Sequence, residues 1–255
     1  MRLTRDNYYS READLIYFSA SQIKTFMDCP ARAMAELNGE YAQPESPALL
    51  VGSYVDAYFE GPEVFERFKA EHPNIFKRDG TLKSEYLQAD EMIERARRDK
   101  VFMEFMDGDK QVILTGTIFG YPFKAKPDVL KLKERIVDLK TVKDFEPLYK
   151  AEQGRISFAE YWGWTLQMAI YQTVEGNQLP TFLNCITKQS PPDIGTIFIP
   201  QHHIDAELAV LAEKLPYFDA IKQGVIEPPR CERCAYCRAT KQQAGPISLD
   251  ELTEY

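Results

Sequence analysis

Residues 136–141, the most informative part of this sequence, read Ile136-Val137-Asp138-Leu139-Lys140-Thr141. Aliphatic and β-branched residues favour a strand here, and an acid and a lysine stand at alternate positions. Because successive side chains of a strand point to opposite faces, Asp138 and Lys140 are expected on one face, while Val137 and Leu139 enter a core on the other. We therefore predict a strand with one polar and one apolar face.

Two further strands are predicted directly before this one. Gln111–Ile118 has strand composition, residues 119–122 (Phe-Gly-Tyr-Pro) form a turn, and Phe123–Lys131 returns as a second strand. The sequence thus predicts a three-stranded meander with Asp128 on its second strand and Asp138 on its third.

These two acids and the lysine are suited to one kind of chemistry. Carboxylates bind Mg²⁺ or Mn²⁺, and an ammonium beside such an ion can orient or help deprotonate an attacking water. A lone acid-x-lysine pair is usually a solvated surface pair, but an acid on the adjacent strand makes that interpretation weaker. We expect Asp128 and Asp138 to bind metal, Lys140 to position the water, and the chain to hydrolyse nucleic acid.

Helices are predicted at Ser84–Phe105, which is amphipathic with alternating charge, and at Phe158–Glu175. Leu166, Ile170 and Val174 recur at helical spacing and form the expected core stripe. Gln167 and Tyr171 are four residues apart, so they share another face, which could be a packed surface or part of a site.

Together these residues resemble a known family. Asp128, Asp138-Leu139-Lys140 and Gln167-x-x-x-Tyr171, in this order, resemble the PD-(D/E)XK nucleases, in particular the branch of RecB-type nuclease domains and RecE-like phage or prophage exonucleases. Ser19–Phe26 followed by Cys29-Pro30 looks like the opening motif of that branch, and Val51–Ala57 looks like its early helix.

The resemblance implies a fold, an activity and a site. It implies a restriction-endonuclease-like α/β fold, in which a mixed sheet is flanked by helices, and catalytic roles for Asp128, Asp138, Lys140, Gln167 and Tyr171. Asp56 stands where the family presents a histidine to the metal, and is an expected third ligand. Gln111 and Thr117 stand on the strand where relatives often carry a glutamate, which leaves one metal or two open.

The implied activity is a Mg²⁺- or Mn²⁺-dependent 5′–3′ exonuclease on double-stranded DNA ends in phage-type recombination. A single-strand annealing protein is the implied partner, and a homo-oligomer is one assembly to expect. No Walker P-loop is present, so ATP should not be needed. The alternative is a protein module of the same fold that can no longer bind the metal, and that instead binds DNA or recruits partners.

A second set of candidate ligands is Cys231, Cys234 and Cys237, with Cys29 as the fourth. Three thiols in one short loop are typical of metal ligands in a reducing compartment. Relatives with one early and three late cysteines hold a [4Fe–4S] cluster, which is therefore the first expectation, with zinc and no metal as alternatives. Cys185 lies among apolar residues and is predicted in the core.

Composition and charge complete the prediction. With 255 residues, 44% of them hydrophobic, the chain can form one compact nuclease domain, with a helical part (1–105), a nuclease core (106–225) and a Cys-rich tail (226–255). We expect no membrane span and a cytoplasmic location. The net charge is −8, but residues 124–143 carry seven basic side chains against three acidic ones, so a basic surface is expected around the site.

Overall fold

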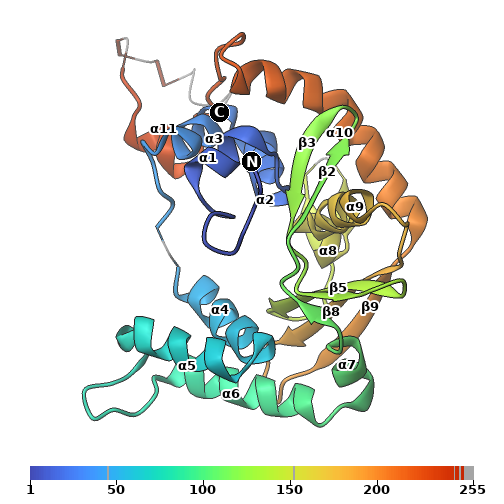
Figure 1. Cartoon of the computed structure of the whole chain (residues 1–255). Helices are drawn as coiled ribbons and strands as arrows, with labels where there is room; N and C mark the ends of the chain where they lie inside the picture. The colour runs from blue at the N-terminus through green and yellow to red at the C-terminus, as the bar shows by residue number, and fades with distance from the viewer. Residues whose placement is uncertain (45, 152, 244, 247, 250–255) are drawn as a thin grey trace.

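The fold is known from a computed structural model, which describes residues 1–255 except 45, 152, 244, 247 and 250–255. The predicted tail, 226–255, therefore lies partly outside the described residues. Helices precede and follow a central set of strands (Figure 1). The helices are α1 (Arg11–Ile16), α2 (Ala20–Asp28), α3 (Pro30–Asn38), α4 (Pro47–Glu60), α5 (Pro62–Glu71), the 3-10 turn η1 (Pro73–Ile75), α6 (Ser84–Arg97), α7 (Lys100–Phe105), α8 (Phe158–Tyr161), α9 (Trp164–Glu175), α10 (Gln201–Lys222) and α11 (Ala235–Ala239).

The strands form one main sheet and two hairpins. The main sheet has the order β1-β4-β5-β8-β9, in which β5 and β8 are parallel and every other pair is antiparallel. Its members are β1 (Asp109–Lys110), β4 (Val129–Lys131), β5 (Arg135–Val142), β8 (Thr181–Thr187) and β9 (Ile194–Ile199). The hairpins are β2 (Leu114–Ile118) with β3 (Tyr121–Ala125), and β6 (Leu148–Lys150) with β7 (Gly154–Ile156). This mixed sheet with helices on both faces is the predicted α/β class.

Each face of the main sheet has its own hydrophobic core. Val137 and Leu139 of β5 pack with α4, α6 and α7, whereas Ile136 packs on the other side with α9, α10 and the β2–β3 hairpin. In Figure 1 the first group lies below the sheet and the second above it. The alternation predicted for β5 is therefore confirmed, but its polar face is also covered, because α9 lies over it.

The predicted three-stranded meander is wrong. Phe123–Lys131 is not one strand: β3 ends at Ala125 and pairs with β2 in a separate sheet, and β4 begins at Val129 in the main sheet. Pro127 lies in the break, where its missing N–H and fixed φ disfavour a continuous ladder. Asp128 therefore lies between two strands rather than within one.

Two predicted helices are also divided. The helix predicted at 158–175 is α8 and α9, separated at Gly163, whose φ of +62° an L-residue rarely adopts. The helix predicted at 84–105 is α6 and α7, because Asp99 has extended backbone and caps α7. In the described part of the chain, no helix combines the length and apolar character that crossing a membrane requires.

Candidate active site

Strand β5 places Asp138 and Lys140 on the face that α9 covers. The Asp138 side chain is only 2% exposed, and its Oδ2 forms an ion pair with Lys140 Nζ. The Lys140 ammonium also lies 5.6 Å from the centre of the Trp164 ring. A buried carboxylate is costly unless it is paired, so β5 holds Asp138 and Lys140 as one unit.

Asp128 reaches the same unit from the break between β3 and β4. Its Oδ2 accepts a hydrogen bond of 2.7 Å from the backbone N–H of Leu139, and its Oδ1 accepts one of 2.7 Å from Gln111 Nε2. Gln111 was expected on the strand 111–118, but that strand begins only at Leu114, and Gln111 lies before it and orients the neighbouring carboxylate. Nothing in the local sequence indicates this role.

Gln167 and Tyr171 project from α9 onto Asp138. Gln167 Nε2 lies 2.9 Å from both Asp138 Oδ1 and the Tyr171 hydroxyl, and that hydroxyl donates to the carbonyl of Lys126 at 3.4 Å. Tyr171 is 9% exposed, and the helix stripe of Leu166, Ile170 and Val174 is buried as predicted. The Gln–Tyr pair thus belongs to the carboxylate cluster rather than to an unrelated surface.

Asp56 approaches from the opposite side, on α4. A cavity of about 10 Å³ is lined by Asp56, Glu60, Gln111 and Asp128, among others, and this is about the space that one water or ion centre needs. Glu60 is an acid that sequence analysis missed, although it stands one helical turn after Asp56. Close packing brings α4 here: a Cβ at Gly52 would lie 3.3 Å from Thr141 Oγ1 of β5.

Burial and mutual repulsion dominate the electrostatics of these acids. Burial first, and then the charge of Asp138, raise the pKa of Asp128 to about 7. Burial and the charge of Asp128 likewise raise the pKa of Asp56 far above its ordinary value. Burial opposes the charge of Lys140, but Asp138 and Asp128 outweigh it and raise the pKa of the ammonium. A set of crowded carboxylates whose ionisation is disfavoured is suited to a divalent cation, which would relieve the repulsion.

Lys24 is a further basic group that sequence analysis missed. It projects from α2, and its Nζ lies 3.5 Å from Gln167 Oε1. Burial first, and then the charge of Lys140, lower the pKa of Lys24 to about 8. Lys24 lies within the motif Ser19–Phe26, which could have marked it as a functional residue. Nothing in the local sequence indicates that it contacts α9.

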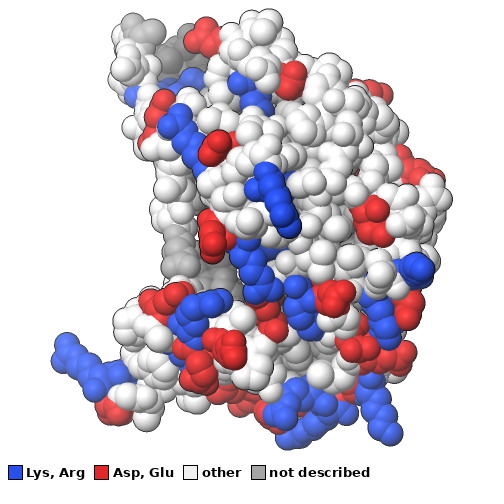
Figure 2. Space-filling model, viewed as in Figure 1, with Lys and Arg blue, Asp and Glu red and all other residues white. Residues whose placement is uncertain are grey.

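The predicted basic surface around the site is wrong. Of the seven basic residues between 124 and 143, five have a carboxylate within 4.0 Å: Lys124, Lys131, Arg135, Lys140 and Lys143. Lys124 is also only 1% exposed, which removes it from the surface. Figure 2 shows both signs of charge interspersed on the face in view, most densely around α5, α6 and α7. The acids that neutralise these side chains come partly from distant segments, so a count along the chain could not include them.

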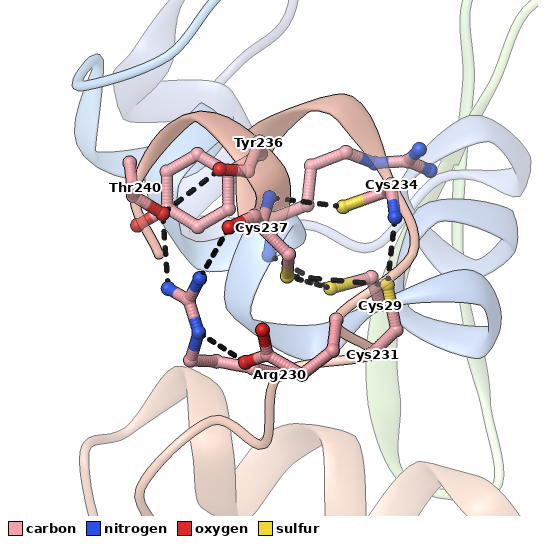
Figure 3. Close-up of polar contacts among 9 residues, drawn as sticks. Cys29, Arg230, Cys231, Cys234, Tyr236, Cys237 and Thr240 are labelled. Atoms are coloured by element: carbon pink, nitrogen blue, oxygen red, sulfur yellow. Dashed lines mark hydrogen bonds and ion pairs between the residues drawn. The ribbon is translucent and has the colours of Figure 1, made fainter. Parts of the chain in front are cut away.

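The four cysteines meet at a separate place. Cys29 caps the start of α3, while Cys231, Cys234 and Cys237 lie in the loop and first turn of α11 (Figure 3). All four sulfurs lie within 4.8 Å of one another, with 3.6 Å between Cys29 and Cys237 and 3.9 Å between Cys231 and Cys237. None forms a disulfide. Among the described residues this is the one group of three or more candidate ligands that meets so closely.

The spacing of these sulfurs fits a single metal ion. A tetrahedral ion with Zn–S bonds of about 2.3 Å requires sulfurs roughly 3.8 Å apart, and four cysteines on the corners of an iron–sulfur cube would stand farther apart. Backbone N–H groups point at the sulfurs of Cys29, Cys231 and Cys234. Burial opposes ionisation of Cys231, but N–H donors from Arg233 and Cys234 prevail and lower its pKa to about 6. Cys185 is buried in the core as predicted.

The structure therefore brings Asp128, Asp138, Lys140, Gln167 and Tyr171 into one connected cluster, with Asp56 facing it across the small cavity. This arrangement of acids and lysine around a mixed sheet defines the class of the protein, and the comparisons with known proteins agree. Residues 19–240 match the family described as "PDDEXK-like domain of unknown function (DUF3799)". The chain belongs to this PDDEXK-like family.

Two crystal structures are among the solved structures that match the chain. One is a crystal structure of a candidate exonuclease from Eubacterium rectale, with 39% sequence identity and a TM-score of 0.95 over 99% of this chain and 98% of that one. The other, SSO0001, has 16% sequence identity and a TM-score of 0.31 over 79% of this chain and 87% of that one. No curated protein matches the chain significantly.

Proposed function

We propose that this protein is a metal-dependent deoxyribonuclease that degrades double-stranded DNA from 5′ ends without ATP, as in phage-type recombination. The main structural support for hydrolase activity is the buried Asp138, which is paired with Lys140 and hydrogen-bonded to Gln167, with Asp128 beside it. Membership of the PDDEXK-like family and the likeness to the candidate exonuclease of E. rectale support it.

The proposed roles follow from the donor set. Asp128 and Asp138, with Asp56 or Glu60 across the cavity, would hold Mg²⁺ or Mn²⁺, which supplies charge neutralisation at the scissile phosphate and a water of lowered pKa. Lys140 would orient that water from its place against Asp138. Gln167 holds the Asp138 carboxylate, Gln111 holds that of Asp128, and Tyr171 fixes Gln167 in turn. Lys24 would neutralise a phosphate on the α2 side.

The decisive experiment uses linear duplexes labelled at the 5′ or the 3′ end and a closed circle of the same sequence, with Mg²⁺, Mn²⁺ or EDTA and no ATP. We expect metal-dependent loss of the linear DNA with early release of the 5′ label, and an intact circle. Early release of the 3′ label would reverse the proposed polarity, and cutting of the circle would contradict an exonuclease.

Substitution of Asp138 tests the site itself. Asp138→Asn is expected to abolish cleavage because it removes a ligand charge, and Lys140→Met to slow it by about 10²-fold or more. Asp107→Asn is the matched control, since Asp107 forms an ion pair with Lys131 at the surface. Wild-type cleavage by Asp138→Asn would refute the assignment, and a protein that binds DNA but never cleaves it would support the alternative of a binding module.

At the second site we propose that Cys29, Cys231, Cys234 and Cys237 bind one tetrahedral ion, for which zinc is the best match. The distances between the sulfurs support this ion over the [4Fe–4S] cluster of the initial expectation. Its proposed role is structural, because four cysteine ligands leave no open coordination position.

A further inference from the structure

A second cavity, of about 280 Å³, lies between the start of the chain and helices α1 to α3. Figure 1 shows these helices gathered around the N-terminus, beside β3. Its lining includes one aromatic ring, that of Tyr9, and several hydrogen-bonding side chains, among them Arg11, Ser21 and Thr25. None of these residues has a role in the active site described above.

Both walls of this cavity are connected to the active site. On one wall, Ser21 and Thr25 flank Lys24 on α2, and Lys24 contacts Gln167. On the other, the ring of Tyr9 lies 4.5 Å from Lys126 Nζ, and the carbonyl of Lys126 accepts the hydrogen bond from Tyr171. The cavity and the carboxylate cluster are therefore joined through Lys24 on one side and Lys126 on the other.

Two side chains of the lining are free to meet a ligand. Tyr9 is 71% exposed, although its neighbour Tyr8 is buried. Arg11 donates from Nε to the carbonyl of Leu37 at 2.9 Å, and its two terminal nitrogens have no hydrogen-bond partner among the described residues. An exposed aromatic ring beside lysine and arginine groups is the combination that binds unpaired nucleotides, because the ring stacks on a base and the cations meet the phosphates.

The two acids of the lining are largely neutralised and do not repel such a ligand. Asp14 forms an ion pair of 2.7 Å with Lys124. Glu36 lies 3.6 Å from Arg32, and burial raises its pKa. The cavity therefore presents a ring, hydroxyls and one arginine rather than a negative surface.

We propose that this cavity receives one unpaired nucleotide of the DNA strand, with its base stacked on Tyr9 and a phosphate at Arg11. The proposal rests on the proposed nuclease function and adds to it a substrate class: DNA whose end is single-stranded or frayed beside the cleavage site.

The test is fluorescence anisotropy without added Mg²⁺ or Mn²⁺, where no cleavage is expected, with a labelled single strand and the same strand carrying abasic residues at its ends. Tyr9→Ala is expected to weaken binding of the ordinary strand by about 5- to 100-fold, as for one lost stacking contact, and to leave the abasic strand unchanged. Tyr9→Phe should bind both strands as the wild type does. Tyr149→Ala is the matched control, because Tyr149 is also 71% exposed and does not line the cavity.

Two outcomes would overturn the proposal: equal binding of the ordinary strand by Tyr9→Ala and wild type, or an equal loss on ordinary and abasic strands. The proposal would also be overturned if wild type and Tyr9→Ala bound the DNA strand equally, but only wild type bound a nucleoside monophosphate. That result would assign the cavity to free nucleotides. Because Tyr9 is exposed, the variant should melt as the wild type does. Absence of metal-dependent cleavage in the wild type would refute the nuclease function instead, independently of these affinities.

Discussion

At the residue scale, the raised pKa of Asp128 has a consequence for stability. Its ordinary value is 3.8, and burial with the charge of Asp138 raises it to about 7 in the folded chain. Between these values the folded protein holds a proton that the unfolded chain has lost, so the stability that this group contributes is lost as pH rises from about 4 through 7. A divalent cation bound at the ionised carboxylates would reverse that loss.

We therefore predict that Mg²⁺ raises the melting temperature more at about pH 8 than at about pH 5. Asp128→Asn should remove most of this difference, because the amide has no proton to lose. Asp107→Asn should keep it, since Asp107 pairs with Lys131 at the surface and its pKa is lowered. Calorimetry with and without added Mg²⁺ at both pH values checks this, and an equal Mg²⁺ effect at the two values in the wild type would contradict it.

At the scale of elements, the break between α8 and α9 sets the position of Lys24. Gly163 has a φ of +62°, and a Cβ there would lie 3.0 Å from Lys24 Cδ. Gly176, after α9, has a φ of +90° with no atom within 4 Å of its Cβ position. Both glycines have a positive φ, but only Gly163 lies against a side chain of the active site, that of Lys24.

Gly163→Ala and Gly176→Ala are expected to lower stability similarly, by about 1 kcal/mol, because both force an L-residue into the left-handed region. Cleavage should fall only in Gly163→Ala, since the methyl group pushes Lys24 away from Gln167. Denaturant unfolding and initial rates measured on both proteins separate the two effects. Equal rates in the two variants would show that the α8–α9 break does not position Lys24.

At the scale of the whole molecule, the cysteine cluster joins the two ends of the chain. Cys29 precedes α3, and Cys231, Cys234 and Cys237 follow α10, so a shared ion closes a loop that contains all the strands β1 to β9. Such a closure restricts the unfolded chain and couples metal binding to folding. We predict that the purified protein is colourless, carries one equivalent of zinc, and melts at lower temperature after chelation.

Cys234→Ser should lose zinc and melt earlier. Cys185→Ala, which removes a core thiol whose pKa burial raises to about 12, should melt earlier yet keep its zinc. Metal analysis with melting curves distinguishes the two. A brown protein containing iron and sulfide would contradict the zinc proposal and restore the [4Fe–4S] expectation, and a protein with neither metal would refute the closure.

The sequence alone determined the features that depend on local periodicity. The β5 strand is as predicted, and Gln167 and Tyr171 share a face of α9, because alternation and helical spacing are properties of neighbouring residues. The spacing of Cys231, Cys234 and Cys237 grouped those three, the family resemblance added Cys29, and the four sulfurs lie within 4.8 Å of one another. The catalytic and metal-binding roles of all these residues stay predictions.

Other features depend on residues far apart in the chain, and the fold itself established them. It placed Asp128 in a break rather than in a strand, paired Lys124 and Lys131 with acids far along the chain, and brought Lys24 against Gln167. It also formed the cavity beside Tyr9 from separate segments. The physical reason is that burial, ion pairing and close packing act between elements that the fold brings together, and no local pattern records which elements will meet.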